Sequence, residues 1–93
     1  RGYPIGKYFV DGVVNNTIYE FLGDYWHGHN RLEKGLNHID IQIRRMLTQV
    51  RFEEIQKLTG FNIRYVWESD WNEYRKLGGQ LKLRTFKGKV EID

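Results

Sequence analysis

The sequence predicts a small α/β domain in which a mixed β-sheet is flanked by helices, with an α+β domain as the alternative. Three observations indicate this class: a β-hairpin near the N-terminus, a long helix after it, and a further strand that returns to the hairpin. A length of 93 residues suits one domain with one modest core, and 40% hydrophobic residues favour a folded chain.

The composition excludes some classes of protein. The chain contains no cysteine, which rules out disulfides and thiolate metal sites and fits a reducing compartment. No apolar run approaches the roughly 18 residues of a membrane helix, so we expect no membrane partner. A net charge of +3 and a pI near 9.3 favour polyanionic partners only weakly. Because the chain begins with Arg1 and carries no signal peptide, we expect residues 1–93 to be a single domain from a longer protein.

The hairpin is predicted from two short runs that are rich in β-branched and aromatic residues. These runs are residues 7–14 and 17–22. Between them lie Asn15 and Asn16, and asparagine tolerates the positive φ that a tight turn requires.

A two-residue turn sets the register of this hairpin. It pairs Val14 with Thr17 and, counting outward, Asp11 with Glu20. Directly opposed residues share a face with Cβ atoms about 5 Å apart, so the two carboxylates would repel each other. We therefore expect a shared proton or a divalent cation between them, and Mg²⁺ suits such oxygen ligands. A bulge at Gly12 would shift this register. If no site is present, Asp11 caps a turn and Glu20 is a solvated strand residue.

A long helix is predicted over residues 39–59, ended by Gly60, and a third strand over residues 61–67. The apolar residues of the helix have near-helical spacing and are expected to form its buried face: Ile43, Met46, Leu47, Val50, Ile55 and Leu58. The opposite face is charged, and three of its residues are candidates for phosphate contacts, with a solvated face as the alternative: Arg44, Arg45 and Arg51.

The remaining segments are predicted as a loop and short elements. Residues 23–37 read as a loop, and Ser69 is a plausible N-cap for a short helix over residues 70–76. Residues 81–86 and 90–92 are either edge strands or a tail.

The predicted loop contains several residues that carry chemistry. Asp24, His27 and His29 follow the second strand, and a histidine beside a Mg²⁺–phosphate site can act as a general base or acid. Together with His38 and carboxylates, the two histidines are alternatively half of a zinc site. Trp26 is either a core or rim aromatic or a side chain that inserts between bases.

The run IYEFLGDYWHGH, preceded by VDG and followed by FEEIQKLTGFNIRYVWESDW, resembles the very short patch repair (Vsr-like) endonucleases. The shared order is an aspartate-bearing strand, a strand that enters WHGH, a charged helix and a strand that ends in VWE. The resemblance spans roughly residues 7–71 and extends to the PD-(D/E)xK nuclease superfamily and its Vsr-like homing endonucleases. It implies a restriction-endonuclease-like core and Mg²⁺-dependent hydrolysis of DNA, with Mn²⁺ as a substitute metal.

The resemblance also implies roles for individual residues. Asp11 falls on the principal metal ligand, Glu20 on the acid of the E-x-K motif, and His27 on the histidine that activates the nucleophile. Leu22 stands where the lysine of E-x-K is expected, which favours His27 for that role. Asp24 would orient His27 or a water, with a turn residue as the alternative. The predicted catalytic set is Asp11, Glu20, Asp24, His27 and His29, with the metal on Asp11 and Glu20.

The leading hypothesis is the catalytic domain of a metal-dependent DNA endonuclease of homing type. Its expected partner is double-stranded DNA, contacted by Trp26, Arg44, Arg45 and Arg51, with specificity from a separate DNA-binding domain. The implied location is intracellular, in a bacterial or phage-infected host. The repair enzymes' cysteine-held zinc and N-terminal acidic helix have no counterpart here, so mismatch specificity is not expected.

Three alternatives were weighed against this hypothesis. The first is a DNA-binding module that kept the fold and lost cleavage. The second is an HNH-type nuclease using His29, Asn37 and His38, but the required order of elements is missing. The third is a domain without nucleic-acid function, which would lack a basic concave face.

Overall fold

A computed structural model describes residues 2–29 and 37–88. The elements are, in order, β1 (Tyr3–Ile5), β2 (Tyr8–Val10), β3 (Gly12–Val14), β4 (Thr17–Leu22), α1 (Asp24–His27), α2 (His38–Thr59), β5 (Asn62–Trp67), α3 (Glu68–Leu77) and β6 (Arg84–Thr85).

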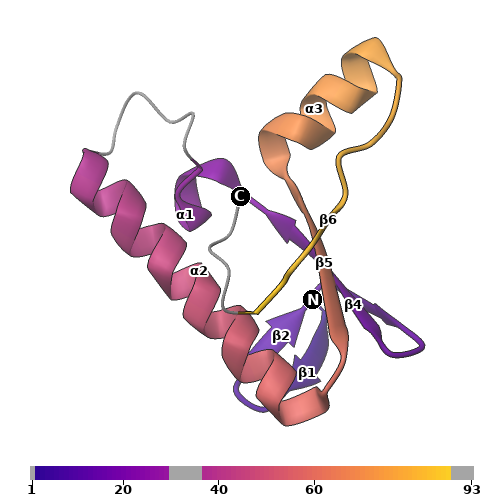
Figure 1. Cartoon of the computed structure of the whole chain (residues 1–93). Helices are drawn as coiled ribbons and strands as arrows, with labels where there is room; N and C mark the ends of the chain where they lie inside the picture. The colour runs from indigo at the N-terminus through magenta and orange to yellow at the C-terminus, as the bar shows by residue number, and fades with distance from the viewer. Residues whose placement is uncertain (1, 30–36, 89–93) are drawn as a thin grey trace.

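Four strands form a mixed sheet in the order β3-β4-β5-β6 (Figure 1). The central pair, β4 and β5, is parallel, whereas β3–β4 and β5–β6 are antiparallel. Parallel neighbours need a crossover, and the segment containing α2 supplies it. The predicted class is confirmed: the fold is α/β, with a small mixed sheet flanked by helices. None of the helices in the described ranges has the length and apolar character that crossing a membrane requires.

The hairpin between β3 and β4 has the predicted register. Val14 pairs with Thr17 and Gly12 with Tyr19, so no bulge shifts the strands. Asn15 adopts a φ of 55°, the left-handed conformation that the tight turn needs.

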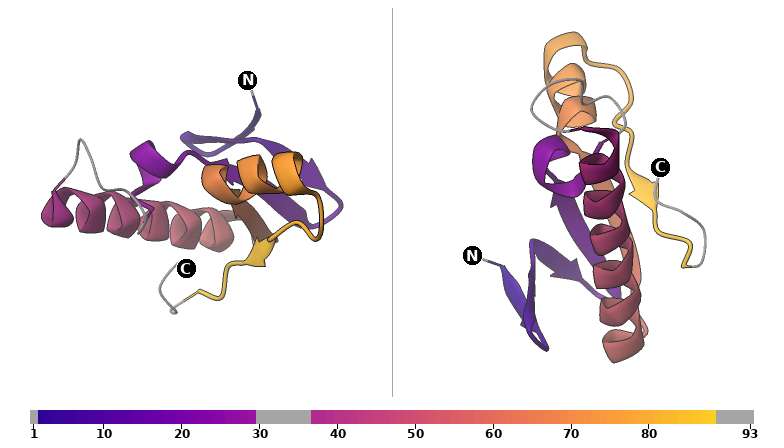
Figure 2. Two further views of the ribbon diagram at one scale, coloured as in Figure 1. Left: turned by 90° about the horizontal axis from the view of Figure 1, so that it is seen from above. Right: turned by 90° about the vertical axis from the view of Figure 1, so that its left-hand side faces the viewer.

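The strand predicted over residues 7–14 is interrupted at Asp11, and this prediction was wrong in extent. The chain bends there, so that β2 pairs with β1 in a separate two-stranded ribbon and only β3 joins the main sheet. Figure 2 shows this ribbon turned away from the sheet at the N-terminal end.

The core lies between the sheet and α2. Alternate residues of β4 and β5 point toward the helix, because successive side chains of a strand face opposite sides. The buried cluster comprises Val10, Ile18, Leu22, Phe52, Ile55, Ile63, Tyr65, Trp67 and Phe86.

The prediction of which face of α2 is buried was wrong. The buried residues of the helix are Ile41, Arg45, Thr48, Phe52 and Ile55. Of the six apolar residues expected inside, only Ile55 is buried, and the exposed fractions of the other five range from 43% to 63%. The physical reason is that polar residues of α2 find partners inside the domain and so occupy positions that apolar residues usually take.

Several element boundaries in the structure differ from the predicted ones. Residues 23–29 contain the short helix α1, so the predicted loop is partly helical, and residues 30–36 and 90–92 lie outside the described range. The third helix begins at Glu68 after Trp67, so Ser69 is not its N-cap. In contrast, α2 ends at Gly60 as predicted, with a φ of 70°.

Gly28 allows α1 to approach α2 closely. It has a φ of 73°, and a Cβ atom built there would lie 2.3 Å from the carbonyl oxygen of Ile41. This position therefore requires glycine for two reasons, backbone conformation and space.

We expect Gly28→Ala to destabilise the domain by about 3 kcal/mol or more, because strain and backbone overlap add. Gly60→Ala is the matched control, since Gly60 also has a positive φ but its added Cβ would meet nothing within 4 Å. We expect it to cost about 1 kcal/mol. Urea unfolding of both variants measures the difference, and equal losses would contradict the close approach.

Candidate functional site

Glu20 is an acid at a core-facing position. It lies between Ile18 and Leu22 on the side of β4 that faces α2, and only 6% of its surface is exposed. Burial raises the pKa of Glu20 to about 7; Arg51 opposes this shift and Asp11 adds to it. A buried carboxylate with a strongly shifted pKa is a common mark of a functional site.

Asp11 lies beside Glu20, as the hairpin register predicted. The backbone N–H of Asp11 donates to Oε2 of Glu20 at 3.4 Å. The backbone N–H of Phe21 donates to Oδ2 of Asp11 at 2.7 Å, which ties the Asp11 carboxylate to β4. Asp11 occupies the bend just before β3, so its position depends on the interruption of the first strand.

Arg51 reaches from α2 into this pair. Its Nη2 donates to Oε1 of Glu20 at 2.7 Å and to the carbonyl oxygen of Phe9 at 2.6 Å. The sequence led us to expect a proton or a metal ion between the carboxylates, but the structure also supplies a guanidinium. The prediction that Arg51 contacts DNA is not supported, because its side chain is only 24% exposed and paired with Glu20.

His27 is held by Thr48 on the facing side of α2. Its Nδ1 lies 2.8 Å from Oγ1 of Thr48, whose hydroxyl donates to the carbonyl oxygen of Arg44 at 2.9 Å. Because the hydroxyl proton is used in this way, Thr48 accepts from His27, and the proton of neutral His27 resides on Nδ1. This leaves Nε2 with a lone pair, as a general base requires.

The electrostatic surroundings keep His27 neutral. Burial lowers its pKa and Arg51 lowers it further, while Asp11 raises it. Asp11, Glu20, His27 and Arg51 therefore form one electrostatic cluster. No sequence pattern indicates the role of Thr48, because a threonine inside a helix does not reveal a histidine partner.

Asp24 occupies a capping position instead of orienting His27. Its Oδ1 accepts from the backbone N–H of Ser69 at 3.3 Å, and Oε1 of Glu68 accepts from the backbone N–H of Asp24 at 3.1 Å. The two carboxylates thus cap the first turns of α3 and α1 reciprocally, where acids are favourable. Thr48 holds the His27 ring in place of the predicted Asp24.

His29 and Arg45 pack around Trp67. The His29 ring is 7% exposed and meets Trp67 edge to face at a centroid distance of 4.6 Å. The Arg45 guanidinium lies 6.0 Å from the centroid of the same indole, and Arg45 is buried. Neither the supporting catalytic role predicted for His29 nor the DNA contact predicted for Arg45 fits these positions, since both residues are enclosed.

Trp26, Tyr25 and the half-buried Arg44 form a cluster at the surface next to His27. Trp26 is 71% exposed and meets Tyr25 edge to face. The Arg44 guanidinium lies 4.7 Å from the Tyr25 ring and 5.4 Å from the Trp26 ring. Of the predicted DNA-contacting residues, Trp26 and Arg44 are therefore the ones at the surface.

The donor set fits Mg²⁺ better than zinc. Asp11 and Glu20 offer carboxylates, and Mg²⁺ is commonly bound by one or two carboxylates with water and phosphate oxygens. Within residues 2–29 and 37–88, no group of three or more acids and histidines is arranged to hold a metal. The histidines do not converge: His27 contacts Thr48, His29 packs on Trp67, and His38 bonds to Gln42.

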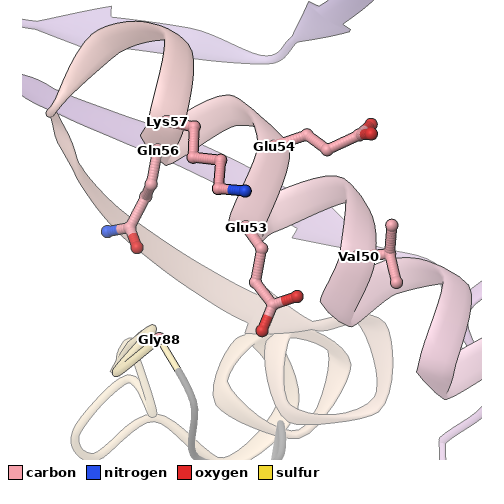
Figure 3. A pocket seen from close by; sticks show the side chains of 6 residues that line it. All are labelled: Val50, Glu53, Glu54, Gln56, Lys57 and Gly88. Carbon is pink, nitrogen blue, oxygen red and sulfur yellow. The ribbon is translucent and has the colours of Figure 1, made fainter.

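A hollow elsewhere on α2 contains none of the predicted site residues. Figure 3 shows Glu53 and Gln56 pointing toward Gly88, with Lys57 nearby. The hollow has two carboxylates, from Glu53 and Glu54, and one amine, from Lys57. This charge balance does not favour binding of a polyanion.

No family model, curated protein or solved structure matches this chain. The interpretation of the site therefore depends on its geometry.

We expect Glu20 to make stability depend on pH. Its pKa is raised from 4.5 to about 7 on folding. As the pH rises, the unfolded chain loses this proton first, so the free energy of unfolding falls by up to about 3 kcal/mol between these values. Glu20→Gln removes this contribution. Urea unfolding in EDTA at pH 4.5 to 8 measures it, with the exposed Glu73→Gln as control; equal slopes in wild type and Glu20→Gln would contradict the prediction.

We expect Thr48 to select the tautomer of His27. In Thr48→Val the acceptor for Nδ1–H is lost, so the neutral ring should shift toward the Nε2–H tautomer, whereas Thr48→Ser should keep the wild-type tautomer. The ¹⁵N chemical shifts of the imidazole nitrogens above pH 8 report this directly. A ring that stays in the Nδ1–H form in Thr48→Val would refute the assignment.

Proposed function

We propose that this domain is a metal-dependent endodeoxyribonuclease that hydrolyses phosphodiester bonds in double-stranded DNA. The observation that carries the proposal is the contact between Asp11 and the buried Glu20 on the hairpin, together with the electrostatic influence of Asp11 and Arg51 on His27. The resemblance to Vsr-like nucleases supports the same assignment and favours the catalytic domain of a homing endonuclease. The enzyme would then act inside the cell, and a separate DNA-binding domain would supply its target specificity.

Each residue has a distinct part in this proposal. Asp11 and Glu20 would hold Mg²⁺, which supplies positive charge to the phosphate oxygens. Nε2 of His27 takes the proton of the attacking water as the new P–O bond forms and the ester oxygen leaves. A histidine with a lowered pKa is neutral at pH 7 and is therefore ready to accept this proton.

The exposed Trp26 and the half-buried Arg44 are the proposed DNA contacts. They adjoin His27 in the sequence and across the α1–α2 contact, and Arg44 also donates to the carbonyl oxygen of Tyr25 at 3.3 Å. An aromatic ring with a guanidinium above it can contact bases or sugars and phosphates together.

We expect Asp11→Asn, Glu20→Gln and His27→Ala each to lower cleavage of plasmid DNA with Mg²⁺ or Mn²⁺ by at least about a hundredfold, because each removes charge or a base from the site. The matched control is Asp40→Asn, which changes an exposed aspartate at the start of α2.

Two results would contradict the proposal. Undiminished cutting by Asp11→Asn would remove the metal site. Salt-sensitive DNA binding without cleavage in any divalent metal would instead favour the alternative, a DNA-binding module on the same fold. That alternative is favoured by one observation: Arg51 already engages the Glu20 carboxylate.

A further inference from the structure

Arg51 is a fixed part of the acidic pair. Its guanidinium bonds both Glu20 and the Phe9 carbonyl, and it lies 5.1 Å from the centroid of the Tyr8 ring. These contacts come from β2 and β4, so the cation is held by two strands. A side chain placed in this way cannot easily leave when another ligand approaches.

The charge balance of the cluster has a direct consequence for metal binding. When both acids are ionised, two carboxylates and one guanidinium leave one net negative charge, because Arg51 offsets one acid. A divalent cation that enters turns this to one net positive charge. One phosphate group brings the sum to zero, so metal and DNA each improve the site for the other.

We infer that Arg51 is a resident counter-ion that keeps the metal-free site folded and holds metal affinity low until DNA supplies the missing negative charge. This inference rests on the proposed function, because it assumes that Asp11 and Glu20 receive the metal. Arg51 thereby acts as a positioning residue for Glu20 and couples metal binding to DNA binding.

The test is a titration with Mn²⁺ alone, in which binding is measured by calorimetry or by the EPR signal of the free ion. We expect Arg51→Met to bind Mn²⁺ about tenfold more tightly than wild type in the absence of DNA, because a nearby positive charge repels a divalent cation strongly. Arg75→Met removes the same charge from an exposed position on α3 and should leave the affinity unchanged. A purely structural role for Arg51 would weaken metal binding instead.

The second arm measures coupling to DNA. In a His27→Ala background, which slows cleavage of the duplex, a short duplex should tighten Mn²⁺ binding by about tenfold. Adding Arg51→Met should reduce that gain, since the metal site then needs the phosphate less.

The outcomes separate the inference from the proposed function. If folded Arg51→Met binds Mn²⁺ no more tightly than wild type, the inference is overturned while the metal site stands. If neither protein binds Mn²⁺ at a site that Asp11→Asn abolishes, the proposed function itself fails.

A folding defect in Arg51→Met does not block the test. Glu20→Gln leaves no buried charge for Arg51 to neutralise, so the double variant Glu20→Gln/Arg51→Met is expected to fold. It should bind Mn²⁺ at Asp11 more tightly than Glu20→Gln alone, and equal affinities would overturn the inference. Circular dichroism confirms that each variant is folded before titration.

Discussion

The ion pair between Glu20 and Arg51 ties α2 to the sheet. A carboxylate on the core-facing side of β4 is tolerable only with a partner, and removing one member of a buried pair costs roughly 3–5 kcal/mol. Arg51 meets Glu20 from the edge of the buried face of α2, which fixes the rotation of that helix. With this rotation, Thr48 faces α1 and holds the His27 ring. The acid that defines the site is therefore also the acid that orients the helix beside it.

Local signals in the sequence were sufficient to predict the part of the site that lies on the hairpin. Asn15 indicated the turn, the turn set the register, and the register placed Asp11 beside Glu20, as the contact between them confirms. These inferences succeeded because a two-residue turn determines its neighbours through backbone geometry alone.

The sequence could not reveal which side of α2 is buried. Its aliphatic residues suggested one face, whereas the structure buries Arg45 and Thr48 on the other, because Trp67 and His27 offer them partners. Such partners come from distant parts of the chain, so the periodicity of one helix cannot predict them. The ribbon of β1 and β2 was missed for a related reason: at the bend, the Asp11 carboxylate accepts a hydrogen bond from the backbone N–H of Phe21, which lies in another strand.

The reciprocal caps between Asp24 and Glu68 join residues that are 44 positions apart. Contacts of such long sequence separation form only after the intervening chain has been closed into a loop. During synthesis, the hairpin with its two acids emerges well before the strand and helix that secure α1. A partly made chain would thus present the carboxylates without an anchored histidine. The arrangement ties completion of the candidate site to completion of the domain, so that the candidate site is not assembled on an unfinished chain.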